Sequence, residues 1–321
     1  MSTNTYRQKK VAIMVPCYNE EVAIAQVIAD FKKAIPEAAI VVFDNNSSDR
    51  TTEVSLQAGA QVAHVSLKGK GNVVRRMFAD IEADVYVMVD GDATYEAGAV
   101  KRLIDHLIDN NLDMVVGCRE EQGDSNTYRQ GHRWGNKMLT GTVSAIFGGQ
   151  FTDMLSGYRA FSRRYAKSFP AIAKGFEIET ELTVHALELR MPYGEISTQY
   201  GARPEGSESK LSTYKDGWRI LKTIIRLHMM ERPLTFFGVV SALMALLSVI
   251  LAAPIFVEYL TTGLVSRLPT AVLSMGLMLS ALLSLVCGII QDTVTRGRHE
   301  TKRLMYLSIP AIKNIGFDDH V

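Results

Sequence analysis

Residues 85–95 read VYVMVDGDATY, and this stretch decides the fold class. Its first five residues form an apolar, largely β-branched run without polar interruption, which is typical of a strand buried on both faces. The run ends in Asp90 and Asp92, separated by Gly91. Because ligands of open α/β sheets bind at the carboxyl ends of the strands, we expect both carboxylates to face a ligand. Such a pair suits Mg²⁺ or Mn²⁺, which keep part of their coordination shell for substrate phosphates. For the triplet alone, a solvated acidic turn is the alternative.

Other short apolar runs alternate with helical patterns along the first two thirds of the chain. We expect further strands at 11–16, 39–43, 61–65, 112–117 and 193–200, and helices that include 20–33, 97–109 and 127–147. Strands that alternate with helices at this spacing predict a mainly parallel sheet with right-handed crossovers. The predicted fold class is therefore α/β.

Polar clusters follow three successive predicted strands. Asp44 follows the second strand, the loop of Lys68 and Lys70 follows the third, and the two aspartates follow the fourth. Carboxylates for a metal and lysines for phosphate would meet at one sheet edge, which suits a nucleoside-diphosphate ligand. The first strand is not followed by Gly-x-Gly-x-x-Gly, and Gly-Lys-Gly at 69–71 is not a P-loop. A dinucleotide enzyme or a P-loop NTPase is therefore disfavoured.

Length, charge and cysteine spacing restrict the class further. With 321 residues, two structural units are expected. A net charge of +1 without interleaved aromatic and basic residues argues against a nucleic-acid partner. Cys17, Cys118 and Cys287 lie far apart, which argues against a disulfide framework or a zinc site. The first apolar run is too short for a signal peptide, so we expect the first domain in the cytoplasm.

The last third of the chain predicts a membrane anchor. Segments 234–257 and 268–290 are almost free of charge, and each reaches the ~20 residues that a helix needs to cross a bilayer. We expect two transmembrane helices; a buried hairpin of a soluble protein is the alternative. Before them, 218–230 mixes apolar residues with Lys222, Arg226 and other basic residues, which is typical of a helix lying on anionic lipid.

Basic residues flank the predicted spans unevenly. Several precede the first span and several follow the second, whereas the loop 258–267 carries one. The positive-inside rule then places both termini in the cytoplasm, in a multi-pass protein of the cell (inner) membrane. The expected domains are a cytoplasmic catalytic domain at 1–212, an amphipathic helix at 213–232, two transmembrane helices at 233–292 and a cytoplasmic tail at 293–321. Small residues in the first span could pair two copies of the chain: Gly238, Ser241, Ala242 and Ala245.

Six motifs precede the two spans in a characteristic order. They are Pro16-Cys17-Tyr18-Asn19-Glu20-Glu21, Asp44, Lys68-Gly69-Lys70-Gly71, Asp90-Gly91-Asp92, Ser156-Gly157-Tyr158-Arg159 and Gly206-Ser207-Glu208-Ser209-Lys210-Leu211. This ordered set resembles the GT-A inverting glycosyltransferases of family 2. Within that family it is similar to the polyprenyl-phosphate glycosyltransferases, such as dolichyl-phosphate mannose synthase and the bactoprenol glucosyltransferases. The resemblance runs from about Lys10 to the end of the second span and implies a Rossmann-like GT-A catalytic domain.

The resemblance implies a role for each matching position. The nucleoside would be held by Pro16, Tyr18, Glu20 and Asp44, and Lys70 would approach the donor. Asp90 and Asp92 would take the metal, Mg²⁺ or Mn²⁺, and the diphosphate, with Asp92 essential for catalysis. The acceptor phosphate would be bound by Arg119 and Arg133. The donor diphosphate would be covered by Arg203, Ser209 and Lys210.

Two positions depart from the family pattern. Asn45 follows Asp44 where the family often has a second aspartate, and Thr94 stands where dolichyl-phosphate mannose synthases have glutamine. UDP-glucose, UDP-N-acetylglucosamine and GDP-mannose therefore all remain open as the donor.

The implied reaction is attack by a polyprenyl-phosphate (undecaprenyl or dolichyl) oxygen on the anomeric carbon of a nucleotide-activated hexose, with inversion. The product would be a polyprenyl-phosphate sugar for cell-envelope glycan modification. Glu177, Glu179 and Glu181 could act as base, support the metal or cap a helix, and capping is the interpretation that we favour. A membrane transferase with a hydroxyl acceptor, which would need a carboxylate base, is the alternative. A non-catalytic scaffold is a third hypothesis, against which the intact aspartates argue.

Overall fold

The computed structural model describes residues 5–121, 130–175, 177–204 and 213–313. The chain forms two compact units, one from 1–223 with 302–321 and the other from 224–301. The strands are β1 (Val11–Cys17), β2 (Ala39–Asp44), β3 (Gln61–His64), β4 (Val85–Met88), β5 (Met114–Glu121), β6 (Arg159–Ser162) and β7 (Tyr193–Tyr200). The helices are α1 (Ile24–Ala34), α2 (Thr51–Gln57), α3 (Lys70–Asp80), η1 (Ala97–Ala99), α4 (Val100–Asp109), α5 (Gln130–Phe147), α6 (Arg163–Ser168), α7 (Ile178–Glu188), α8 (Thr213–Glu231), α9 (Pro233–Thr262) and α10 (Leu268–Leu307).

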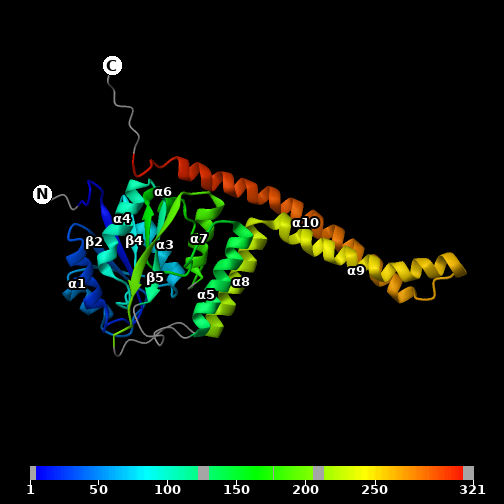
Figure 1. Cartoon of the computed structure of the whole chain (residues 1–321), viewed down its shortest axis with the longest axis horizontal. Coiled ribbons are helices and arrows are strands. Elements are labelled where there is room, and N and C mark those ends of the chain that lie inside the picture. The colour runs from blue at the N-terminus through cyan, green and yellow to red at the C-terminus, as the bar shows by residue number, and fades with distance from the viewer. Residues whose placement is uncertain (1–4, 122–129, 176, 205–212, 314–321) are drawn as a thin grey trace, which may run out of the picture. The chain divides into compact units, whose positions relative to one another are not determined.

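The first unit is an α/β domain built on one mainly parallel sheet (Figure 1). The strand order is β3-β2-β1-β4-β6-β5-β7 in the described part of the chain, and β6 alone among these strands runs antiparallel to its neighbours. The predicted α/β class and mainly parallel sheet are thus confirmed. Strand β6 was not predicted, because four residues with an arginine at the start carry too little periodicity.

Strand β4 is buried on both faces, as its sequence predicts. Val85 and Val87 join the apolar cluster formed with α1 and α4. Tyr86 points to the opposite face, since successive side chains alternate along a strand, and its ring lies edge-on to Phe78 of α3, 6.0 Å between centroids. Helices therefore cover both faces of the strand, so a ligand can approach it at its carboxyl end.

Helix α4 shows how sequence periodicity fixes the layer that covers this strand. Its apolar residues recur at helical spacing, and all five are buried: Val100, Leu103, Ile104, Leu107 and Ile108. Burial of one such side chain contributes about 1.5–3 kcal/mol. This face is therefore sufficient to hold α4 against the sheet.

The C-terminal segment of the described chain also belongs to the first unit. The Tyr306 hydroxyl donates to Asp113 Oδ2 at 2.7 Å, and the Arg164 guanidinium lies 4.6 Å from the centre of the Tyr306 ring. Ile312 is buried in the apolar core. Helix α10 thus continues past the predicted span, and part of the segment expected as a tail packs on the α/β domain.

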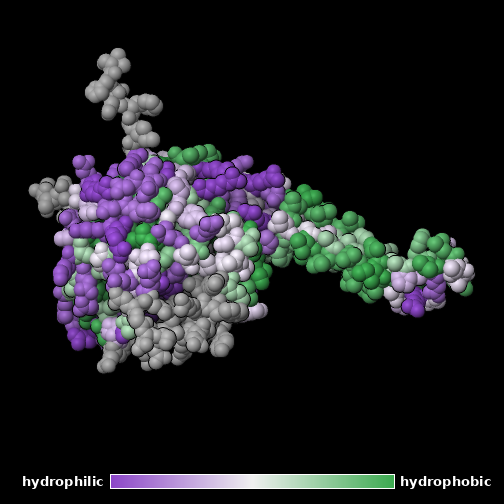
Figure 2. All heavy atoms as spheres, in the orientation of Figure 1, coloured by the Kyte–Doolittle hydropathy of each residue, from purple (hydrophilic) through white to green (hydrophobic). Residues whose placement is uncertain are grey.

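The second unit is a hairpin of two long apolar helices. Helices α9 and α10 each contain a window long and apolar enough to cross a membrane, and only 17% of each window is buried. The Ser241 hydroxyl donates to Ala281 O at 2.7 Å and the Ser248 hydroxyl to Ser274 O at 2.6 Å. Ser241 therefore pairs the two helices of one chain. Figure 2 shows the hydrophobic surface that the hairpin presents.

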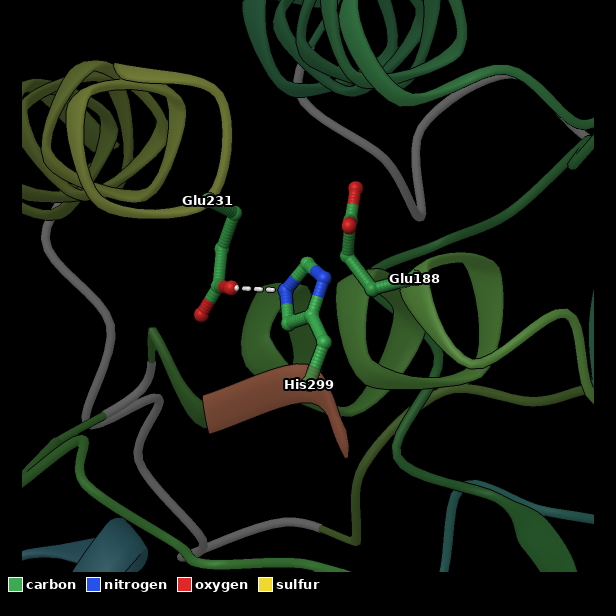
Figure 3. A group of neighbouring side chains, drawn as sticks. All are labelled: Glu188, Glu231 and His299. Carbon is green, nitrogen blue, oxygen red and sulfur yellow. Dashed lines mark hydrogen bonds and ion pairs between the residues drawn. The ribbon is translucent and has the colours of Figure 1, made fainter. Parts of the chain in front are cut away.

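Polar residues close the base of this hairpin. Glu231 Oε2 lies 2.7 Å from His299 Nε2, a contact marked by the dashed line in Figure 3. Thr295 donates to Met230 O at 2.9 Å. These contacts join the end of α8 to α10 within the second unit.

Candidate active site

Three parallel strands bring their carboxyl ends to one edge of the sheet. The register pairs Cys17 at the end of β1 with Asp44 at the end of β2, and Met14 with Met88 in β4. Asp90, two residues beyond Met88, therefore lies level with the end of β1. The convergence of polar clusters predicted from the sequence is confirmed.

The turn after β4 fixes the two aspartates differently. The Asp92 side chain is 7% exposed, and its Oδ1 accepts from the Thr94 hydroxyl at 2.6 Å. Ala93 closes this turn with φ of +57°, a conformation that non-glycine residues seldom adopt. The Asp90 side chain is 28% exposed and lies against the backbone of Gly157, where a Cβ would collide with the carboxylate. Thr94 therefore orients Asp92.

Each aspartate forms an ion pair with a different basic residue. Lys70 Nζ lies 2.5 Å from Asp90 Oδ1 and 2.6 Å from Glu179 Oε1, and Arg203 Nη2 lies 2.6 Å from Asp92 Oδ2. Burial alone lowers the pKa of Lys70, but the charges of Asp90 and Glu179 outweigh it, so the net pKa lies above the ordinary value. Lys70 therefore stays protonated at neutral pH.

The two aspartates fit a hard divalent cation. Burial and the negative charge of Asp90 raise the pKa of Asp92, although Arg203 opposes this rise. Two carboxylates that repel each other at a strand end are relieved by a shared cation, and carboxylate oxygens are the ligands that Mg²⁺ and Mn²⁺ prefer. Asp90 and Asp92 are the residues that would hold it.

The loop that carries Lys70 is held by Asn45 and by close backbone packing. Asn45 Oδ1 accepts from Gly69 N at 2.6 Å, and its Nδ2 donates to Leu67 O at 2.7 Å. Gly69 has φ of +118°, and a Cβ on Gly69 or Gly71 would collide with the carbonyls of 173–174. Asn45 thus holds the loop in place, a role that its sequence position did not indicate.

The three alternating glutamates divide into two kinds. Both Glu181 oxygens accept backbone N–H groups, from Ile172 at 2.9 Å and from Ala173 at 2.7 Å. Glu177 Oε1 accepts from Gly175 N at 3.0 Å. These bonds hold the segment that packs on the Lys70 loop and do not cap α7, whose N-cap residue Glu177 makes no side-chain capping hydrogen bond, so the predicted capping role is wrong for these two. Glu179 differs, since it pairs with Lys70.

The residues expected to hold the nucleoside lie at the ends of β1 and β2. Asp44 is buried, and its carboxylate accepts from Ser47 N at 3.3 Å and lies 3.3 Å from His64 Nδ1. Glu20 is buried and Tyr18 is exposed on the loop after β1. Pro16 pairs with Phe43 in the adjacent strand. The structure therefore gathers Pro16, Tyr18, Glu20 and Asp44 beside one another at this edge.

Arg119 at the end of β5 is held on two sides. Its Nε and Nη2 donate to the two oxygens of Asp153, both at 2.7 Å, and its guanidinium lies 5.5 Å from the centre of the Tyr200 ring. A bidentate pair of this kind fixes the plane of the guanidinium. The sequence did not indicate Asp153 as its partner, because the two residues are distant in the chain.

The remaining predicted site residues are only partly described. Arg133 lies in α5, but its side chain is outside the described residues, as are Ser209 and Lys210. Arg159 of the Ser-Gly-Tyr-Arg motif is fully buried and donates to Ser156 O and to Thr183 Oγ1. This arginine holds the entry to β6, next to Gly157 and Asp90.

Comparison with known proteins decides the family. The model for Glycosyl transferase family 2 matches residues 12–169. Glycosyltransferase AglJ of Haloferax volcanii is 33% identical over 296 residues, which cover 92% of this chain and 97% of AglJ. The chain belongs to glycosyl transferase family 2. It is a glycosyltransferase whose catalytic residues must be sought in the first unit, where the family match lies.

One further relative and one solved structure are also similar to this family 2 chain. The dolichyl-phosphate hexose transferase of Haloferax volcanii is 28% identical over 71% of this chain and 97% of its own length. Glucosyl-3-phosphoglycerate synthase from Mycobacterium tuberculosis, in complex with Mn²⁺, UDP-glucose and phosphoglyceric acid, has a TM-score of 0.57 at 19% identity. That match covers 69% of this chain and 80% of the synthase. The predicted GT-A fold is thereby confirmed.

Proposed function

We propose that this glycosyltransferase moves a hexose from a nucleotide sugar to polyprenyl phosphate at the cytoplasmic face of the cell membrane, with inversion at the anomeric carbon. The single observation that carries the proposal is the cluster at the sheet edge, where Asp90 and Asp92 are paired with Lys70 and Arg203. A relative named as a dolichyl-phosphate hexose transferase, which this chain covers almost entirely, supports the acceptor class. The product would be a lipid-linked sugar for cell-envelope glycans.

The cluster is suited to a leaving diphosphate. Asp90 and Asp92 would hold Mg²⁺ or Mn²⁺, which neutralises the leaving group when bound. When the aspartates take the cation, Lys70 and Arg203 can turn their charge to the diphosphate oxygens. Preorganised positive charge of this kind stabilises the transition state. Ser209 and Lys210 would complete the cover over the diphosphate, and Asp44 with Pro16, Tyr18 and Glu20 would hold the nucleoside.

The acceptor needs positioning more than activation. The second pKa of a phosphate monoester is near 6, so it is already largely a dianion at neutral pH and hardly needs a general base. Arg119, fixed by Asp153, would bind this phosphate together with Arg133. The arginines would also offset the repulsion between acceptor and donor phosphates.

The membrane part would anchor the enzyme in the bilayer that contains the acceptor lipid. Trp218, Ile225 and Met229 are exposed on α8 together with Lys222 and Arg226, which suits a helix lying on anionic lipid. The largely exposed apolar windows of α9 and α10 would cross the bilayer. We propose that both termini stay in the cytoplasm.

A donor screen tests the proposal. Detergent-purified protein is incubated with Mn²⁺ or Mg²⁺, undecaprenyl phosphate and each of UDP-glucose, UDP-N-acetylglucosamine and GDP-mannose. We expect one donor to give a glycolipid whose mass exceeds that of the acceptor by a single sugar. Absence of such a product with every donor, in a preparation that binds nucleotide, would contradict it.

A further inference from the structure

Glu179 lies beside the proposed metal site, and the proposed transfer gives it no role. It stands in the first turn of α7 and is 4% exposed. Burial raises the pKa of its carboxyl group, and the charge of Lys70 opposes that rise. A carboxylate placed this deep is costly unless its oxygens receive hydrogen bonds.

The first oxygen of Glu179 places the carboxylate next to the donor site. Oε1 lies 2.6 Å from Lys70 Nζ, and the same nitrogen lies 2.5 Å from Asp90 Oδ1. Glu179 is therefore separated from a proposed metal ligand by a single ammonium group. The sugar of a nucleotide sugar is bonded directly to the diphosphate, so a carboxylate at this distance from the diphosphate site is within reach of the hexose.

The second oxygen of Glu179 is buried, and no group among the described residues donates a hydrogen bond to it. Glu181, two residues along the same helix, uses both of its oxygens to accept backbone N–H groups. The two glutamates thus differ: both Glu181 oxygens accept hydrogen bonds, whereas Glu179 Oε2 accepts none from the described residues. A carboxylate oxygen only accepts hydrogen bonds, so the missing partner is an O–H or N–H group.

We propose that Glu179 Oε2 accepts a hydrogen bond from a hydroxyl of the donor hexose, which makes Glu179 a specificity-determining residue for the sugar. This inference rests on the proposed function. A charged acceptor rejects a ligand that lacks the matching hydroxyl, because its buried oxygen is then left without a partner. The contribution of such a hydrogen bond corresponds to about a ten- to a hundredfold change in affinity.

A binding experiment separates sugar recognition from mere support of Lys70. Calorimetry with Mn²⁺ measures the Kd of the nucleotide sugar that the donor screen identifies and the Kd of its free nucleoside diphosphate. The ratio of the two values isolates the contribution of the sugar. Lys70 faces the diphosphate, which both ligands share, so a variant that disturbs only Lys70 changes both constants by the same factor.

Two variants and one control complete the test. In Glu179→Ala, the preference for the nucleotide sugar over the free diphosphate is expected to fall about tenfold or more. Glu179→Gln, which keeps the shape of the side chain, is expected to lose less, because its amide can donate to the same hydroxyl oxygen. Glu181→Gln, the same substitution two residues along the same helix, should leave the ratio unchanged.

The outcomes are distinguishable. An unchanged ratio in both Glu179 variants, with wild-type protein that binds the nucleotide sugar, overturns the inference and leaves the proposed function intact. If the wild type binds none of the three nucleotide sugars, the proposed function and the inference are both wrong. A ratio that falls in the Glu179 variants and stays constant in Glu181→Gln supports the inference.

Discussion

Asp92 is the carboxylate most strongly fixed at the sheet edge. It is held by the Thr94 hydroxyl and by Arg203, and its pKa is raised by burial and by the neighbouring Asp90. Its shape and hydrogen bonds can be imitated by asparagine, whereas its charge cannot. Substitutions here therefore separate the electrostatic role of the residue from its structural one.

We predict that Asp92→Asn lowers turnover by about a hundredfold or more, because the proposed metal ion loses one charged ligand and Arg203 loses its ion pair. Turnover and Mn²⁺-dependent nucleotide binding are measured together. Asp84→Asn is the matched control, since Asp84 directly precedes the opposite end of the same strand and accepts a backbone N–H from Lys10. Wild-type turnover in Asp92→Asn would show that the metal assignment is wrong.

We predict that Arg119→Ala raises the KM for undecaprenyl phosphate by about tenfold or more, through loss of charge-assisted hydrogen bonds to the acceptor. The KM for the nucleotide sugar should change much less. Asp153→Asn should shift the same constant in the same direction by a smaller factor, because one of two contacts that orient Arg119 is lost. An effect confined to the donor KM would contradict the acceptor assignment.

At the scale of elements, helix α7 organises the site through its first turn. Glu177 and Glu181 shape the preceding segment, which packs on the glycines around Lys70, while Glu179 contacts Lys70 itself. Alternate acids at a helix start were visible in the sequence. The sequence did not show that these acids make different contacts, because their partners depend on which loop of the folded sheet lies next to them.

We predict that Glu181→Gln destabilises the α/β domain by about 1–2 kcal/mol, since the amide leaves one backbone N–H of 172–173 without an acceptor. This corresponds to a fall in Tm of roughly 2–8 °C for a domain of this size. Thermal unfolding in detergent, followed by intrinsic fluorescence, measures the shift. Glu37→Gln on an exposed turn serves as control, and an equal Tm for both variants would show that the Glu181 hydrogen bonds to 172–173 do not stabilise the domain.

At the scale of the whole molecule, hydrophobic patterns along the sequence predicted most of the strands and the edge of the sheet at which the site lies. Apolar runs predicted six of the strands as strands, and the convergence of Asp44, Lys70 and Asp90 followed from parallel topology. Strand β6 was missed because it is short and antiparallel. The ion pairs Lys70–Asp90, Arg203–Asp92 and Arg119–Asp153 could not be predicted, since each joins residues that only the sheet register brings together.

The end of the second apolar segment was harder to predict than its existence. Charged residues after Ile290 suggested that the span ends there, yet α10 continues to Leu307, because charged side chains are compatible with an exposed helix. Loss of hydrophobicity predicts where a helix would leave a membrane, and it says little about where the helix itself ends.

We predict that the loop between α9 and α10 lies outside the cell membrane. A cysteine placed there as Ser266→Cys should react with a membrane-impermeant maleimide in intact spheroplasts. Lys101→Cys on the exposed side of α4 should react only after lysis, and the wild-type chain, with Cys17, Cys118 and Cys287, measures the background labelling. Labelling of Lys101→Cys in intact spheroplasts would contradict the proposed topology.

The most direct test of the central claim compares two acceptors that differ only in the phosphate. Release of nucleoside diphosphate from the accepted donor is measured with undecaprenyl phosphate and with undecaprenol, in the presence of Mn²⁺. We expect rapid release and a glycolipid product with the phosphate, and background release with the alcohol. Equal release with both lipids, or release with undecaprenol alone, would contradict transfer to a phosphate and would favour a hydroxyl acceptor.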